Sequence, residues 1–192
     1  ISTRFLSAGD IPPELMPASS LKEFKNKNYN YGDIKPEDII FLDIETTGLF
    51  SSSLFLIGTM VYEKEFTVKQ YFARDYAEEK AVIGAFFQLF KTKKVLVTFN
   101  GRTFDMPFIN ARAAVCGIDN EISPVHLDLM HISRRKWKDR LPDCKLQTIE
   151  NYICGRQRHG DIPGYMIPMA YHDYVKSNNA RQMISVLKHN YL

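Results

Sequence analysis

The run Ile39-Ile40-Phe41-Leu42-Asp43-Ile44-Glu45 decides the fold of this chain. Its residues are β-prone and apolar on both faces, which indicates an inner strand covered on both sides. Thr46-Thr47-Gly48 ends the strand. Two acids interrupt the run at a spacing of two, and side chains at that spacing point to the same face of a sheet.

Asp43 and Glu45 are the most informative side chains of the sequence. Two like charges among apolar neighbours are costly to remove from water and repel each other, and bound cations remove both costs. Hard carboxylate oxygens suit Mg²⁺ or Mn²⁺. The alternative, in which Glu45 ends the strand in solvent and Asp43 caps a local turn, is less favoured because Asp and Glu are poor strand formers.

The segments that follow the first strand predict a mixed sheet. Strands are expected at Leu54–Tyr62 and Phe66–Phe72, and the short polar turn between them suits an antiparallel meander. Helical and strand spacings then alternate. We expect further strands at Lys94–Phe99 and Pro124–Leu127, and helices at Ala77–Phe90, Thr103–Cys116, Asp128–Ser133 and Leu146–Cys154, then a loop at Arg156–Pro168 and two helices within Met169–Leu192. This order predicts an α/β fold with a five-stranded sheet, three antiparallel meander strands followed by parallel βα units, and helices on both faces.

Length and composition predict one globular domain. The chain has 192 residues, of which 45% are hydrophobic and 24% charged, so it is neither disordered nor large enough for two ordinary domains. Residues 1–36 are rich in Pro, Ser, Lys and Asn and predict an N-terminal arm with a short helix near Leu21–Lys25, before a domain over residues 37–192. The net charge of +3 permits nucleic-acid binding without arguing for it.

Several classes of protein are not favoured. No apolar run approaches the roughly 18 residues of a membrane span, and residues 1–17 lack the features of a secretory signal. The three cysteines are widely spaced and form no CxxC pair, so neither a zinc site nor a disulfide framework is indicated. We therefore expect a cytoplasmic protein without a membrane partner.

A second acidic segment, Asn100-Gly101-Arg102-Thr103-Phe104-Asp105, places an acid at a helix start just after a strand. Taken alone, Asp105 is best explained as a first-turn acid that stabilises the helix by about 0.5–2 kcal/mol. Alongside Asp43 and Glu45 it becomes a candidate third metal ligand, because the strand before it can lie beside the first strand.

These segments resemble a known family. The stretch 43–48 is similar to the first motif of the DEDD superfamily of 3′→5′ exonucleases, the DnaQ-like nucleases, and the stretch 100–105 is similar to the second. The segment 141–150, Arg158, the segment 161–164 and His189-Asn190 resemble the YprB-like branch of RNase H-like domains. The resemblance covers residues 39–192 and implies an RNase H-like fold.

The resemblance also implies an activity, the hydrolysis of phosphodiester bonds in DNA or RNA by a two-metal mechanism with Mg²⁺ or Mn²⁺. Asp43 would bridge both ions, Glu45 would hold the ion that activates water, and Asp105 would hold the second. His189 would accept a proton from the nucleophile. The alternative is a catalytically inactive RNase H-like nucleic-acid-binding module of a larger protein.

One position departs from the family. The branch places a fourth acid three residues after its His-Asn pair, and here the chain ends at Leu192, one residue before that position. We expect the C-terminal end to be truncated, the 192-residue fragment to be poorly active, and extension by about ten residues, enough to complete the last helix, to raise activity. Without the resemblance, His189 would be explained as a partly exposed histidine at a helix end.

Candidate substrate contacts come from four places. In the family the turn after the metal-binding strand touches the terminal nucleotide, which makes Thr46, Thr47 and Leu49 candidates; a plain strand-ending turn is the alternative. The others are Asn100, Asp128 and Arg135. A helix cap explains Asp128 at least as well, and a solvated helix face around a buried Trp137 explains the basic stretch near Arg135 equally well.

The basic residues Arg156 and Arg158 lie beside Asp161. A loop-fixing ion pair is the favoured interpretation, and contact with phosphate is the alternative.

Overall fold

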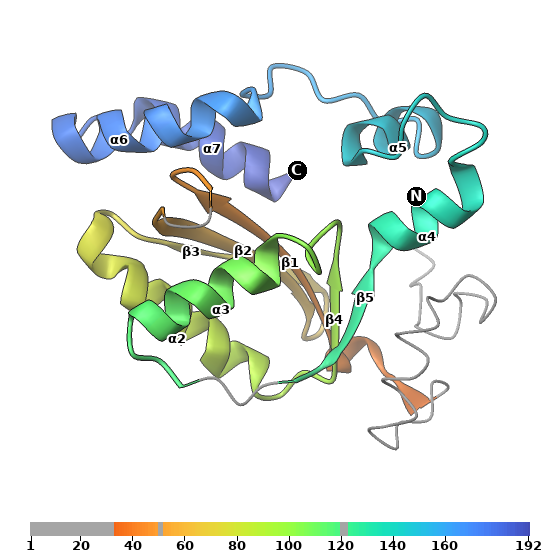
Figure 1. The fold of residues 1–192 in the computed structure, drawn as a ribbon, viewed down its shortest axis with the longest axis horizontal. Coiled ribbons are helices and arrows are strands. Elements are labelled where there is room, and N and C mark those ends of the chain that lie inside the picture. Colours follow the sequence, from red (N-terminus) through yellow and green to blue (C-terminus); the bar gives the residue numbers. More distant parts are fainter. Residues whose placement is uncertain (1–32, 50–51, 120–122) are drawn as a thin grey trace.

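The computed structural model describes residues 33–49, 52–119 and 123–192. Its centre is a five-stranded sheet in the order β3-β2-β1-β4-β5 (Figure 1). The strands are β1 (Ile39–Thr46), β2 (Leu54–Tyr62), β3 (Phe66–Phe72), β4 (Val95–Thr98) and β5 (Val125–Asp128). The first three form an antiparallel meander, and β4 and β5 run parallel to β1. The predicted α/β fold with a mixed sheet is confirmed.

Six α-helices lie within the described residues: α2 (Glu79–Phe90), α3 (Asp105–Val115), α4 (Leu129–Trp137), α5 (Leu146–Tyr152), α6 (Ile167–Ser177) and α7 (Arg181–Tyr191). Short 3-10 helices, η4 (Pro36–Asp38), η5 (Tyr76–Glu78) and η6 (Gly164–Met166), precede β1, α2 and α6. The pair α2 and α3 lies on one side of the sheet, and α6 and α7 lie on the other (Figure 1). Helices on both faces were predicted, and this is confirmed.

Several helix boundaries differ from the sequence prediction, and the differences at α6 and α4 have a physical reason. Helix α6 begins inside the predicted loop, because Pro168 falls in its first turn, where a proline costs no hydrogen bond. Helix α4 continues past Ser133 to Trp137, and its last turn carries three basic side chains that suit the negative end of the helix dipole.

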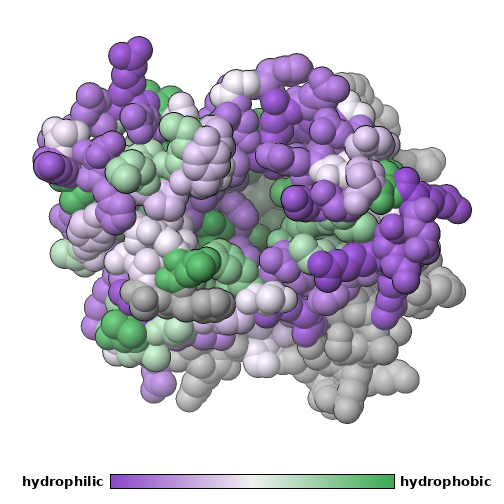
Figure 2. Space-filling view, turned by 45° about the horizontal axis from the view of Figure 1, so that its top comes forward, coloured by the Kyte–Doolittle hydropathy of each residue, from purple (hydrophilic) through white to green (hydrophobic). Residues whose placement is uncertain are grey.

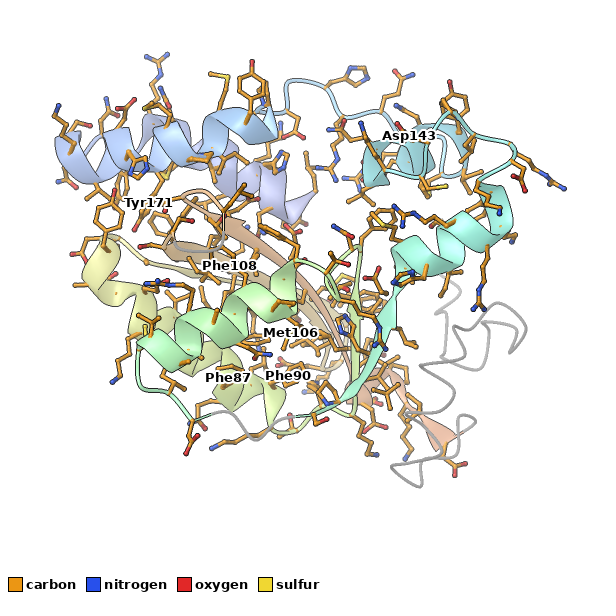
Figure 3. The ribbon with its side chains drawn as sticks, in the orientation of Figure 1. Phe87, Phe90, Met106, Phe108, Asp143 and Tyr171 are labelled. Carbon is orange, nitrogen blue, oxygen red and sulfur yellow. The ribbon has the colours of Figure 1, made fainter. Side chains whose placement is uncertain are left out.

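The core occupies both faces of the sheet. Ile40, Leu42 and Ile44 of β1 belong to the larger apolar cluster, together with side chains of β2, α2, α3, α6 and α7. In Figure 3, Phe87, Phe90 and Phe108 extend from α2 and α3 into this cluster. A smaller cluster contains Ile34, Ile39, Val95, Val97, Val125 and Leu127. The strand β1 therefore has apolar neighbours on both faces, as its sequence predicts.

Two buried contacts fix the helices to the sheet. Tyr171 of α6 stacks on Phe55 of β2 with ring centroids 4.0 Å apart, and its hydroxyl donates to the Ala73 carbonyl at 3.0 Å. Arg112 of α3 donates two hydrogen bonds to Glu79 of α2, at 2.7 and 2.6 Å. The same carboxylate accepts the Leu54 amide at 2.7 Å, so one ion pair joins α2, α3 and β2.

The predicted N-terminal arm, residues 1–36, and its short helix fall outside the described residues except for residues 33–36. Ile34 is buried in the smaller cluster. The division into arm and domain stays a prediction. Within the described ranges, we find no helix with the length and apolar character that crossing a membrane requires.

Candidate active site

Strand β1 carries the first two acids on one face of the sheet. Asp43 lies opposite Gly58 of β2 and Glu45 lies opposite Leu56, so both acids share a face, as their spacing predicts. The parallel pairing of β1 with β4 ends at Phe41, before the acids are reached. Asp105 is the first residue of α3, which follows β4. Because parallel strands end at the same edge, this helix start faces the unpaired end of β1.

The three carboxylates are close enough to repel one another. Asp105 is only 6% exposed, and burial together with the charge of Asp43 raises its pKa to about 8. Burial, followed by the charges of Asp43 and Asp105, raises the pKa of Glu45 to about 9. Ionising all three carboxylates together therefore requires a positive charge beside them.

Asp43 lines a hollow between α5 and α7. The hollow is also lined by Val97, Thr98, Leu146 and His189. Figure 2 shows this face hollowed between two lobes whose rims are mostly hydrophilic. Solvent reaches the Asp43 side chain, but protein surrounds it on most sides, and this desolvation raises its pKa against the opposing effects of an Asn190 hydrogen bond and of His189 and Arg158.

Asn190 of α7 fixes the Asp43 side chain through hydrogen bonds that span three neighbouring strands. Gln70 of β3, Gly58 of β2 and Asp43 lie side by side in the sheet register. Asn190 of α7 sits over the glycine: its Nδ2 donates to Asp43 Oδ2 at 2.9 Å, and its Oδ1 accepts from Gln70 Nε2 at 2.9 Å. The same Gln70 nitrogen donates to the Leu187 carbonyl at 2.8 Å. A Cβ at Gly58 would lie 2.1 Å from Asn190 Oδ1, so only glycine leaves this space open.

A second chain of polar contacts ends at His189. Its Nδ1 lies 2.8 Å from Asp161 Oδ1. Asp161 Oδ2 accepts from Arg158 at 3.3 Å, and Arg158 donates two further hydrogen bonds to Glu150, at 2.7 and 3.0 Å. These contacts fix the ring of His189 at the rim of the hollow, and the pairing of Arg158 with Asp161 is the ion pair that the sequence predicts.

The chemistry of the three acids fits a divalent cation. They offer hard oxygen ligands whose mutual repulsion a cation would relieve. Within the described ranges, no group of three or more His, Cys, Asp or Glu side chains already has the arrangement of a metal site. One Asp43 oxygen instead accepts from Asn190. Binding an ion therefore requires the carboxylates to turn toward a common point.

The two threonine hydroxyl groups of the turn after β1 form hydrogen bonds within the turn. Thr46 Oγ1 donates to the Gly48 carbonyl at 2.7 Å, and Thr47 Oγ1 accepts the Ser53 amide at 2.9 Å. These contacts are those of a strand-ending turn. Leu49 differs, because 74% of its surface is exposed and it extends from the turn as a large apolar side chain.

Asp128 has a structural role. It is 1% exposed, and its carboxylate accepts the amides of Met130 at the start of α4, of Asn100 at 2.8 Å and of Arg102 at 3.1 Å. Asn100 adopts a left-handed conformation (φ 71°), which this carboxylate stabilises. These contacts agree with the interpretation of Asp128 as a helix cap. Arg135 lies exposed on α4 and lines neither of the two pockets that contain Asp43.

A model of the RNase H superfamily matches residues 40–192, which include the whole sheet from Ile40 onward and all six helices. The chain belongs to the RNase H superfamily. This RNase H-like domain is similar to the uncharacterized protein YprB of Bacillus subtilis, with 34% identity over 172 residues, 85% of this chain and 40% of YprB. The chain thus spans less than half of that relative, and the resemblance to the YprB-like branch is confirmed.

Two DNA polymerases share parts of this RNase H-like domain. The catalytic polypeptide of DNA polymerase epsilon from Emericella nidulans is 34% identical over 83 residues, 40% of this chain and 4% of the polymerase. The structure of the family B DNA polymerase of Pyrobaculum calidifontis matches with a TM-score of 0.62 and 15% identity, covering 82% of this chain and 23% of the polymerase. The second match establishes a shared fold.

Sequence reasoning missed the residues that position the acids. It assigned no role to Gly58 or Gln70, it quoted Asn190 without identifying its partners, and it did not foresee the contact of Asp161 with His189. One signal was present, because a lone glycine in an apolar strand marks a close approach of another group. The identity of that group could not be found in the sequence, since Asn190 lies 132 positions away from Gly58.

Proposed function

We propose that this domain is a metal-dependent nuclease, a 3′→5′ exonuclease of the DEDD type that acts on DNA or RNA. The observation that carries the proposal is the meeting of Asp43, Glu45 and Asp105, with raised pKa values, at one end of β1 beside an open hollow. Perturbed acids in a cleft are typical of functional sites. Membership of a superfamily whose nucleases generally use divalent metals supports the same conclusion.

Asp43, Glu45 and Asp105 would hold Mg²⁺ or Mn²⁺. Such ions supply an activated water and stabilise charge on the phosphate and leaving oxygen. Asn190 holds the Asp43 carboxylate in one orientation until the ion binds. Asp161 accepts the Nδ1 proton of His189, which leaves Nε2 as the basic nitrogen able to take a proton from the nucleophile.

The end of the substrate strand would lie against the turn after β1. Leu49 projects from it as an exposed apolar side chain that can pack on a base. The hydroxyl groups of Thr46 and Thr47 already form hydrogen bonds within the turn. These residues would therefore shape the backbone beside the substrate and would not contact it through their hydroxyl groups. Asn100 and Arg135 remain candidate contacts along the strand.

The test follows the shortening of 5′-labelled oligonucleotides with a free or blocked 3′ end, with Mg²⁺ or Mn²⁺. In a version extended by about ten residues beyond Leu192, we expect stepwise shortening of the free-ended substrate only, and a loss of at least about 100-fold in Asp43→Ala. Asp173→Ala, which removes an exposed acid from α6, is the matched control and should cut normally. Equal cutting by Asp43→Ala and wild type would refute the assignment.

A nucleic-acid-binding module without catalysis is the second candidate. The contact between Asn190 and Asp43 favours it, because this hydrogen bond occupies one carboxylate oxygen of the central acid. The two candidates differ in one outcome. Binding of the oligonucleotide by the extended version without shortening, with either ion, would support the module.

A further inference from the structure

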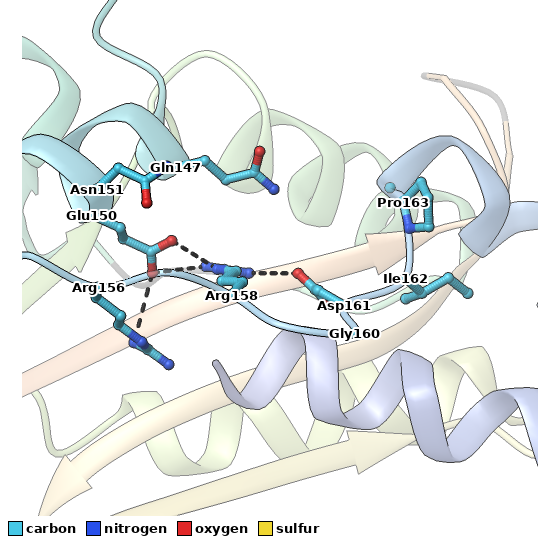
Figure 4. Close-up of a pocket in the computed structure, with 10 residues that line it drawn as sticks. Gln147, Glu150, Asn151, Arg156, Arg158, Gly160, Asp161, Ile162 and Pro163 are labelled. Carbon is cyan, nitrogen blue, oxygen red and sulfur yellow. Dashed lines mark hydrogen bonds and ion pairs between the residues drawn. The ribbon is translucent and has the colours of Figure 1, made fainter.

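A pocket that does not include Asp43, Glu45 or Asp105 lies between α5 and the segment 155–164 (Figure 4). Its volume is about 470 Å³, within the roughly 300–1,000 Å³ of ligand pockets. Gln147 and Asn151 of α5 form one wall, and Arg156, Gly160 and Asp161 belong to the other (Figure 4). None of the contacts described above assigns a function to this pocket.

The pocket adjoins the hollow that contains Asp43. Glu150 and Arg158 line both cavities, so their ion pair forms the wall between them. Arg156 also lines a second cavity that contains Asp43 and Asn190. A strand with its end at the carboxylates can therefore place a neighbouring nucleotide in this pocket.

The two arginines of the pocket differ in how they are used. Arg158 is 10% exposed and is neutralised by Glu150 and Asp161, so its role is to hold the wall. Arg156 is 45% exposed and lies 3.6 Å from Glu150, beyond hydrogen-bond distance. Because Arg158 already satisfies Glu150, Arg156 can turn to an anion without leaving that carboxylate unpaired. Its backbone is anchored, since its amide donates to the Glu150 carbonyl at 2.9 Å.

The opposite wall offers groups suited to a base. Gln147 and Asn151 are exposed, and their amides make no hydrogen bond to residues in the described ranges. Amide side chains carry both donors and acceptors, which lets them bind the edges of bases. A guanidinium faced by two amides across a pocket matches one nucleotide, with its phosphate at the arginine and its base at the amides.

We propose that this pocket is a nucleotide-binding subsite, in which Arg156 binds a backbone phosphate and Gln147 and Asn151 contact the attached base. The subsite rests on the proposed nuclease function, because it would hold the strand whose end reaches Asp43. It fits a single strand, whose bases are free to turn into a pocket.

The test measures the binding of a fluorescent single-stranded oligonucleotide by anisotropy over a range of salt concentrations, with EDTA and separately with Ca²⁺. Arg156→Gln should weaken binding about tenfold for every sequence and lower the slope of log K against log salt by about 0.7, the value for one phosphate contact on a single strand. Arg156→Lys keeps the charge and should retain most of the affinity. Arg181→Gln, an equal loss of charge at the far end of α7, should change little.

The amides are tested separately. The double variant Gln147→Ala/Asn151→Ala should change the relative affinities for dA and dT oligonucleotides and leave the salt slope unchanged. Equal binding by Arg156→Gln and Arg181→Gln would refute the subsite, while shortening that depends on Asp43 would still support the nuclease. A wild-type chain that binds no oligonucleotide in either condition would refute both proposals.

Discussion

Gly58→Ala tests the packing above Asp43 with the smallest possible change. The added Cβ would lie 2.1 Å from Asn190 Oδ1 and 2.8 Å from its Cγ, so Asn190 must withdraw from the sheet. Its hydrogen bonds to Gln70 and to Asp43, each 2.9 Å long, would then break. A neutral bond contributes about 0.5–1.5 kcal/mol and one to a charged group about 1.5–3 kcal/mol.

Two effects reduce this cost. Asn190 is only partly buried, so water replaces some of the lost hydrogen bonding. Replacing glycine also restricts the unfolded chain, which stabilises the fold by about 0.4–1 kcal/mol. We expect a net loss of about 2 kcal/mol in the free energy of unfolding, which lowers Tm by about 4–8 °C in a chain of this size.

The assay is urea and thermal unfolding of the 192-residue chain. Gly84→Ala is the matched control, because a Cβ there meets nothing within 4 Å and the residue lies inside α2. It should stabilise the chain by up to about 1 kcal/mol. A double-mutant cycle with Asn190→Ala isolates the contact, since Gly58→Ala should cost little once Asn190 is truncated. The reasoning is refuted if Gly58→Ala costs nothing, or costs the same with and without Asn190.

Three further predictions concern charged groups. Glu79→Ala leaves Arg112 without its buried partner and should cost about 3–5 kcal/mol in urea unfolding, whereas removing the surface ion pair by Glu78→Ala should cost much less; equal costs would contradict the role of the buried pair. The pKa of Glu45 is about 9 in the folded chain, above its value in the unfolded chain. Without metal, ionisation of Glu45 therefore lowers the free energy of unfolding as the pH rises from about 5 to 9. Thermal unfolding in EDTA should show this loss for wild type relative to Glu45→Gln, and parallel pH profiles would rule it out. Asp161→Asn should lower kcat about 10–100-fold, far more than it weakens oligonucleotide binding, because it no longer fixes the His189 tautomer; an unchanged kcat would remove Asp161 from the mechanism.

Local patterns in the sequence determined the order of the elements and the shared face of two acids. The apolar run at 39–45 gives an inner strand, and the alternation of side chains along any strand puts Asp43 and Glu45 together. The helix predicted over Thr103–Cys116 is followed in the sequence by Gly117, which has the left-handed φ of 64° that favours glycine at a helix end. Such features depend on backbone geometry over a few neighbouring residues, and they are therefore readable from the sequence.

The contacts that position the acids depended on the tertiary structure. Asn190 reaches Asp43 only because β1, β2 and β3 pair in a register that puts Gly58 between Asp43 and Gln70, and because α7 packs over that glycine. His189 meets Asp161 across 28 positions of chain. A shift of one residue in register would turn each side chain to the opposite face. Sheet pairing and helix packing fix these contacts between distant segments, and no local pattern specifies them.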